Sequence, residues 1–143
     1  MVKASMITKK YLNDLTRTII GAAIDVHKEL GPGLLESVYE KCLVHLLRES
    51  GFEIGIQQNV PLFFRGIDID CNLRFDLMVE DLIIVEVKAV ESMLPIHEAQ
   101  LLTYLKLLEK PKGILINFNC TNIFKEGQKT MVTELYAKLP KGY

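Results

Sequence analysis

The sequence predicts a single domain of the α/β (α+β) class over residues 1–143, with helices packed on a sheet. Three observations lead to this prediction. A chain of 143 residues and 16.3 kDa has the size of one ordinary domain. Hydrophobic residues make up 49% and charged residues 24%, which is typical of globular chains that bury a core. The apolar pattern has a helical period in the first 50 residues and a period of two over residues 53–89.

Two amphipathic helices are expected to open the chain. Apolar residues recur at three- and four-residue steps over residues 8–30, which predicts the first helix, and Gly31-Pro32-Gly33 ends it. Residues 34–50 carry a second apolar stripe, which predicts another helix. Gly51 follows it and favours the left-handed conformation that ends a helix.

Period-two alternation then predicts strands. Residues 53–64 are expected to form two short strands that are interrupted at Asn59-Val60-Pro61. Further strands are expected over residues 69–79 and 82–89, with Glu80-Asp81 in the turn between them. These segments form a meander of three or four strands.

One more helix and strand follow the meander. Pro95 fits the first turn of a helix over residues 96–108, because its missing N–H has no helical partner there. Residues 113–118 form a short, fully apolar strand. The remainder up to Tyr136 leaves room for one further hairpin. The predicted order is therefore αα, the meander, α and β.

Composition excludes several classes of protein. No apolar run approaches the eighteen or so residues that cross a bilayer, and the N-terminal residues lack the apolar core of a secretory signal, so a cytoplasmic location without membrane contact is expected. Three widely spaced cysteines form no zinc motif and are expected to be reduced thiols, namely Cys42, Cys71 and Cys120.

Charge is distributed unevenly along the chain. Residues 1–17 carry four basic and one acidic side chain, and residues 105–143 carry seven and three. With a formal net charge of −1, this leaves −8 for residues 18–104. An acidic middle argues against a protein coated in positive charge, yet it permits a cation site flanked by ends that attract phosphate.

The most informative residues are charged side chains within apolar strands. Because side chains alternate along a strand, Arg74 and Asp76 are expected on one face and Phe75 on the other, with Leu77 and Val79. Glu86 and Lys88 share a face of the next strand, which is otherwise the most apolar of the chain. Such a strand is expected inside the sheet, where an ionised group is costly unless it is paired or bound to a metal.

The turn decides how the two acidic residues meet. A loop centred on Asp81 places Asp76 directly opposite Glu86, whereas a two-residue turn makes them diagonal neighbours, roughly 7–8 Å apart between Cα atoms. In either register two carboxylates converge, raise each other's pKa and attract a divalent cation. Lys88, roughly 6.6–6.8 Å along the strand from Glu86, can hold a water or a phosphoryl oxygen beside that cation. This set of residues is suited to hydrolysis.

Other interpretations of these charges stay open at this stage. Arg74 and Lys88 could instead offset Asp76 and Glu86 in a salt-bridge ladder on a solvent-facing sheet surface, which contributes little to stability. The next helix carries a polar stripe that either faces the charged strand or is an ordinary hydrated helix face, formed by His97, Gln100 and Tyr104.

Glu36 and Tyr39 lie one turn apart at the start of the second helix. An acidic residue there is favoured by the helix dipole alone, by roughly 0.3–1 kcal/mol, so position does not identify Glu36 as a ligand. His27 and His45 are expected to be boundary or surface side chains.

Residues 33–39, Gly-Leu-Leu-Glu-Ser-Val-Tyr, resemble the motif that names the GxxExxY protein family. Further motifs follow in that family's order, so the resemblance covers roughly residues 12–132: Arg74-Phe75-Asp76, Glu86-Val87-Lys88, the His97–Tyr104 helix and Leu115–Phe118. The family is similar to the PD-(D/E)xK phosphodiesterases, the restriction-endonuclease-like nucleases. The resemblance implies a restriction-endonuclease-like core, with a central mixed sheet of about four or five strands flanked by helices in the order ααβββ(β)αβ.

The resemblance also implies roles for the residues. Asp76, Glu86 and the Val87 carbonyl would bind Mg²⁺, with Mn²⁺ as a substitute, and Lys88 would position or activate the attacking water. Glu36 would add an outer or second metal contact. Gln100 would orient water or phosphate with support from Tyr104, and the supporting set comprises Tyr39, Arg74, His97 and Tyr104. Phe75 departs from the proline of the nominal motif, and Thr130 stands where a basic residue is expected.

The expected function is Mg²⁺-dependent hydrolysis of phosphodiester bonds in nucleic acid, DNA rather than RNA, by an endonuclease or exonuclease. One alternative is a non-catalytic binding or assembly module of the same fold that forms a homodimer through its apolar first helix. Another is a phosphodiesterase that acts on small molecules.

Overall fold

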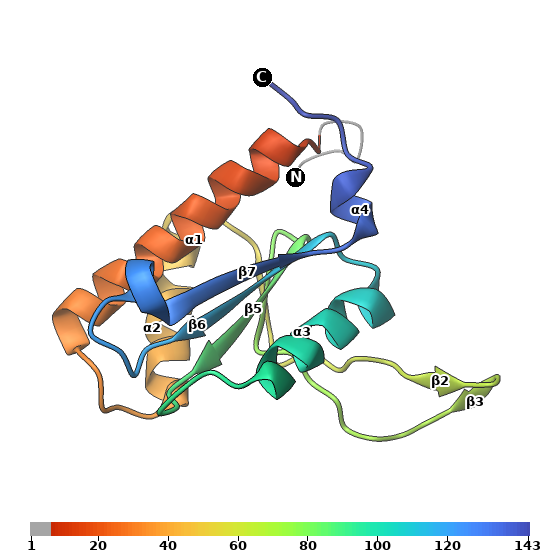
Figure 1. The fold of residues 1–143 in the computed structure, drawn as a ribbon, viewed down its shortest axis with the longest axis horizontal. Helices are drawn as coiled ribbons and strands as arrows, with labels where there is room; N and C mark the ends of the chain where they lie inside the picture. The colour runs from red at the N-terminus through yellow and green to blue at the C-terminus, as the bar shows by residue number, and fades with distance from the viewer. Residues whose placement is uncertain (1–6) are drawn as a thin grey trace.

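A five-stranded mixed sheet with helices on both faces forms the centre of the protein (Figure 1). The computed structural model describes residues 7–143. The strand order is β1-β4-β5-β6-β7, and β2 and β3 form a separate two-stranded hairpin. The prediction of a mixed sheet of four or five strands flanked by helices is confirmed.

The helices are α1 (Lys9–Leu30), α2 (Glu36–Glu49), α3 (Pro95–Leu108), the π-helical turn η2 (Ile123–Gly127) and α4 (Glu134–Ala137). The strands are β1 (Ile54–Ile56), β2 (Phe63–Phe64), β3 (Ile67–Asp68), β4 (Leu77–Val79), β5 (Ile83–Lys88), β6 (Lys112–Asn117) and β7 (Gln128–Val132).

Helix α1 begins where the sequence predicts. The Thr8 hydroxyl accepts a hydrogen bond from the Tyr11 N–H at 3.0 Å, which satisfies a donor that the helix cannot pair internally. Gly31, at φ 67°, ends the helix, and its N–H donates to the His27 carbonyl. The apolar stripe of α1 is buried in the core against the sheet, so it is not the open pairing surface that the assembly alternative requires.

Helix α2 begins two residues later than expected, at Glu36. The Tyr39 hydroxyl donates to the Gly31 carbonyl at 2.6 Å and accepts from the Leu34 N–H at 3.1 Å. These bonds hold the turn outside the helix, so Leu35 has an extended backbone and precedes the first helical residue.

Two hydrophobic clusters lie on opposite faces of the sheet. Helices α1 and α2 cover the face that presents Leu77, Val85 and Ile114. Helix α3 covers the other face, which presents Met78, Ile84 and Leu115. Figure 1 shows this three-layered arrangement.

The expected strand over residues 69–79 is wrong in its first part, because β4 begins only at Leu77. The chain between β1 and β4 instead extends as a two-legged arm, residues 57–76, with β2 and β3 at its tip (Figure 1). Backbone bonds join the legs, from the Val60 N–H to the Leu73 carbonyl and from the Gln57 N–H to the Asp76 carbonyl. Strict alternation also fails here, because Phe75 packs with the α3 cluster and not with Leu77 and Val79.

The hairpin between β4 and β5 has the register centred on Asp81. Leu77 pairs with Val85 and Val79 with Ile83. Glu80 and Asp81 both have positive φ, of 53° and 56°, and the Leu82 N–H donates to the Val79 carbonyl. The diagonal register considered from the sequence is therefore not formed.

Strand β6 joins the sheet by pairing parallel to β5, with helix α3 as the connection between them. Strand β7 then pairs antiparallel to β6, which is the further hairpin that the sequence left room for. The three cysteine thiols are free. Within residues 7–143, no helix combines the length and hydropathy needed to cross a membrane.

Candidate functional site

The carboxyl groups of Asp76 and Glu86 meet between β4 and β5. The Asp76 N–H donates to Glu86 Oε2 at 2.9 Å, and the Val87 N–H donates to Asp76 Oδ2 at 2.8 Å. The Glu86 side chain thus accepts a backbone hydrogen bond from the residue before β4, and the Asp76 side chain accepts one from β5. This arrangement leaves one oxygen of each carboxyl group, Oδ1 and Oε1, outside these two bonds.

Burial controls the chemistry of Glu86, which is 3% exposed. Loss of solvent raises the pKa of Glu86 to about 8, and the nearby charge of Asp76 adds to the rise, while the Lys88 ammonium opposes it. At neutral pH without a cation, the Glu86 carboxyl group therefore keeps its proton. The solvent-facing salt-bridge ladder considered from the sequence is wrong, because Glu86 is buried and accepts a backbone N–H.

Lys88 completes the charged face of β5. It lies two residues beyond Glu86 and is half-buried next to the paired residue Asn117 of β6. Because side chains alternate along a strand, its ammonium group shares the α3 side of the sheet with the Glu86 carboxyl group. Its positive charge accordingly opposes the rise in the pKa of Glu86.

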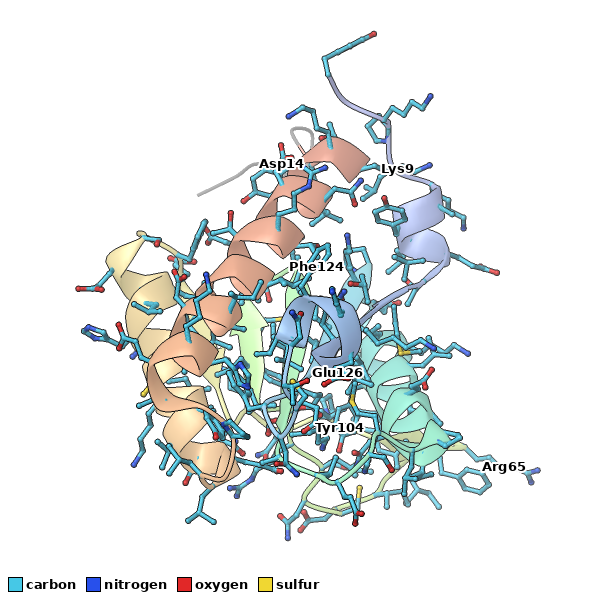
Figure 2. The ribbon with its side chains drawn as sticks, turned by 60° about the vertical axis from the view of Figure 1, so that its left-hand side comes forward. Lys9, Asp14, Arg65, Tyr104, Phe124 and Glu126 are labelled. Atoms are coloured by element: carbon cyan, nitrogen blue, oxygen red, sulfur yellow. The ribbon has the colours of Figure 1, made fainter. Side chains whose placement is uncertain are left out.

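Helix α3 brings two of its polar residues to this face. Burial raises the pKa of Tyr104, and the charges of Glu86 and Asp76 add to the rise, so its hydroxyl remains protonated near the carboxyl pair. Gln100 Nε2 donates to the Tyr104 hydroxyl at 3.1 Å. In Figure 2, Tyr104 lies toward the centre of the molecule, whereas Arg65 lies at its outer edge.

Two other predicted supporting residues have local structural contacts. His97 Nδ1 accepts the Leu94 N–H at 3.0 Å and so caps the start of α3. Arg74 is exposed on the arm, where it forms an isolated bridge with Asn59.

Sequence reasoning missed Glu40 and Gln57. Gln57 Nε2 lies 3.3 Å from Asp76 Oδ1 and 3.1 Å from each carboxyl oxygen of Glu40, so it links α2 to the carboxyl pair. Burial raises the pKa of Glu40, and the charges of Asp76 and Glu36 also raise it, while the bond from Gln57 opposes the rise. The only available signal was that Glu40 lies one helical turn after Glu36.

The motif residues Glu36 and Tyr39 are placed differently from each other. Glu36 is exposed, and its charge contributes to the raised pKa of Glu40. Tyr39 is buried, where its ring stacks on Phe118 with centroids 4.4 Å apart. Its hydroxyl holds the turn before α2, so Tyr39 positions the helix that carries both glutamates.

The donor groups suit a hard divalent cation. No group of three or more histidine, cysteine, aspartate or glutamate side chains in residues 7–143 is arranged to hold a metal ion. Mg²⁺ nevertheless keeps several waters and is often held by one or two carboxylates together with substrate phosphates. Asp76 and Glu86 supply two carboxyl groups side by side, each with one oxygen outside the bonds that join them, so the residues present fit the ion.

Comparison with known proteins agrees with this geometry. The family model of the PD-(D/E)XK nuclease superfamily matches residues 13–131, which include both strands of the carboxyl pair and helix α3. The chain therefore belongs to the PD-(D/E)XK nuclease superfamily, and its five-stranded mixed sheet is consistent with a restriction-endonuclease-like fold. Neither a curated protein nor a solved structure gave a match.

Proposed function

We propose that this protein is a divalent-metal-dependent nuclease that hydrolyses phosphodiester bonds in DNA. The observation that carries the proposal is the reciprocal bonding of Asp76 and Glu86 inside the sheet, with Lys88 on the same face. Membership in the PD-(D/E)XK nuclease superfamily supports it. The motif over residues 33–39 supports the finer placement among the GxxExxY proteins.

In this proposal, Asp76 and Glu86 would hold Mg²⁺ or Mn²⁺ together with the Val87 carbonyl. The cation would supply positive charge at the scissile phosphate and make a water more acidic. Glu86 would bind it as the carboxylate, because a proton and a cation compete for the same carboxyl group. Glu36 is proposed as an outer contact, and Glu40 adds a second acidic group linked to Asp76 through Gln57.

The remaining polar groups act on the water and the phosphate. The Lys88 ammonium donates to the attacking water or to a phosphate oxygen, where it stabilises the negative charge that develops during the reaction. The Gln100 amide, which is bonded to the Tyr104 hydroxyl, is held in an orientation from which it contacts the same water or phosphate.

A cleavage assay tests the proposal. Single-stranded, duplex and branched DNA, and RNA of the same sequence, are incubated with Mg²⁺ or Mn²⁺ and wild-type protein or the Lys88→Ala variant. We expect cleavage by the wild type and a loss of roughly 10²–10³-fold in Lys88→Ala, since a charge that stabilises the transition state is removed.

Lys138→Ala is the matched control, because Lys138 is exposed and lines the groove between α3 and α4, away from the carboxyl pair. This variant should cleave like the wild type. Cleavage that survives in both Lys88→Ala and Asp76→Asn would reject the assignment of these residues. Cleavage of RNA alone would reject the preference for DNA.

A further inference from the structure

A groove runs along helix α2 beside β1 and has a volume of about 580 Å³. We call it the α2 groove, and its polar lining consists of Ser37, Glu40, Lys41, His45, Arg48 and Gln57. Glu40 and Gln57 lie at one end and also belong to the network around Asp76. The groove is therefore linked to the candidate site through Gln57, which contacts both Glu40 and Asp76.

Two cations and a histidine line the groove on one face of α2. Lys41, His45 and Arg48 follow one another at steps of four and three residues, which places them in a row on the helix. All three are exposed. From Lys41 to Arg48 the row rises about 10.5 Å along the helix axis. The row is therefore long enough for its two end residues, Lys41 and Arg48, to contact two separate phosphates of one strand.

Arg48 is held in place at the far end of the groove. One of its terminal nitrogens donates to the Ile54 carbonyl of β1 at 3.2 Å. A guanidinium group has five N–H donors, so this bond fixes the side chain and leaves other donors free to bind a ligand. Such a positioned arginine is suited to bidentate contact with a phosphate.

Nearby acidic groups limit what the groove can hold. Glu40 is at the end next to the candidate site, and Glu49 lies 3.5 Å from His45 on the outer side of the helix. The two permanent positive charges, Lys41 and Arg48, stand out within a stretch of chain that is acidic as a whole. These two positive charges favour an anionic ligand that lies in the groove and extends from it towards Asp76 and Glu86.

We propose that the α2 groove binds the sugar-phosphate backbone of the nucleic-acid strand that flanks the scissile phosphate, with Lys41 and Arg48 as its phosphate contacts. This inference rests on the proposed function for the identity of the ligand. The charges lie in one row along one helix, so the groove contacts one strand. It orients that strand so that it enters the site past Gln57.

The dependence of binding on salt tests this assignment. A fluorescently labelled oligonucleotide, single-stranded or duplex, is titrated with protein in EDTA at several NaCl concentrations, so that binding is measured without cleavage. Each phosphate contact contributes about 0.7 to the slope of log K against log salt for a single strand and about 0.9 for a duplex. In Lys41→Gln/Arg48→Gln the slope should therefore become shallower by about 1.4 or about 1.8.

A second groove offers the matched control. It lies between α3 and α4, has a volume of about 610 Å³ and carries Lys106 and Lys138, but shares no residue with the candidate site. Lys106→Gln/Lys138→Gln should leave the slope unchanged. Lys41→Gln alone, at an exposed position, should reduce it by about 0.7 for a single strand, which keeps the test decisive if Arg48→Gln loosens β1.

The outcomes separate this inference from the proposed function. An unchanged slope in the Lys41 and Arg48 variants, or an equal loss in the control pair, would overturn the groove assignment while cleavage stands. Binding with the expected slopes but no cleavage with any metal would support the groove and reject the hydrolysis. Failure of the wild type to bind any oligonucleotide would overturn both, and equal binding of poly-glutamate would overturn the identity of the ligand.

Discussion

The carboxyl group of Glu86 lies inside the sheet, where water does not solvate its charge. Its pKa of about 8, against an ordinary value of 4.5, results first from this burial and then from the charge of Asp76. The protonated form is therefore the resting form at neutral pH in the absence of a cation. Proton release and cation binding at this residue are thus coupled.

This coupling predicts a pH dependence of stability. An acid whose pKa is raised in the folded state stabilises the fold below its ordinary pKa, and that contribution is lost as pH rises through the folded value. In EDTA, the free energy of unfolding should fall between about pH 4.5 and about pH 8, by an amount on the order of a few kcal/mol.

Urea unfolding at several pH values across this range measures the effect. Glu86→Gln is the matched variant, because its neutral amide resembles the protonated acid. The two proteins should be about equally stable at the acidic end, and the variant should become the more stable one at the alkaline end. A difference between them that does not change with pH would contradict the assignment of the shift to Glu86.

The turn between α1 and α2 determines where the second helix begins. Tyr39 bonds to both the Gly31 carbonyl and the Leu34 N–H, and its ring stacks on Phe118. Because α2 carries Glu36, Glu40 and the lining of the α2 groove, the tyrosine positions several parts of the site without contacting the carboxyl pair.

Tyr39→Phe should therefore affect stability more than chemistry. It removes a hydroxyl that satisfies one donor and one acceptor, and we expect a loss of about 1–3 kcal/mol in the free energy of unfolding, since two part-buried hydrogen bonds of about 0.5–1.5 kcal/mol each are lost. Urea unfolding measures this loss, and the cleavage rate below the melting temperature should fall by much less than in Lys88→Ala. A variant that is as stable as the wild type yet inactive would instead place the Tyr39 hydroxyl in the reaction.

At the scale of the whole molecule, a bound cation should stabilise the fold. A ligand that binds only the folded state adds RT ln(1 + [L]/Kd), or about 2.7 kcal/mol at a concentration one hundred times Kd. Millimolar Mg²⁺ or Mn²⁺ should therefore raise the melting temperature, and more so at higher pH, where the Glu86 proton competes less. Thermal melts with and without EDTA measure the shift.

Two variants show whether the shift comes from the carboxyl pair. Asp76→Asn should reduce the stabilisation by metal, whereas Lys88→Ala should retain it. No shift in the wild-type protein would favour a non-catalytic module of this fold.

Much of the fold follows from local sequence pattern. A turn centred on Asp81 is enough to set the register of β4 and β5, because pairing in a hairpin depends on neighbouring residues. The bounds of α1 follow for the same reason, with Thr8 and Gly31 at its ends. The sequence alone does not place strand β7, because its residues are mostly exposed and show no apolar stripe.

The parts that could not be predicted depend on contacts between distant segments. Gln57 meets Glu40 only because the start of the arm passes α2, and no local pattern indicates this contact. Residues 69–76 alternate like a strand, yet they pair with the other leg of the arm and do not extend β4, as the bond from the Val60 N–H to the Leu73 carbonyl shows. Tertiary packing therefore decided these positions.

Asp76 lies at the boundary where the regular ladder of β4 stops. Its carboxyl group accepts the Val87 N–H and so takes over the task that a neighbouring backbone carbonyl performs elsewhere in a sheet. Substitution of Asp76 would break this hydrogen bond between the two strands and would also remove a proposed metal ligand. Loss of activity in an Asp76 variant alone would not show which of the two changes caused it. Lys88→Ala is therefore the sharper test of the proposed chemistry, because none of the hydrogen bonds between β4 and β5 involves the Lys88 side chain.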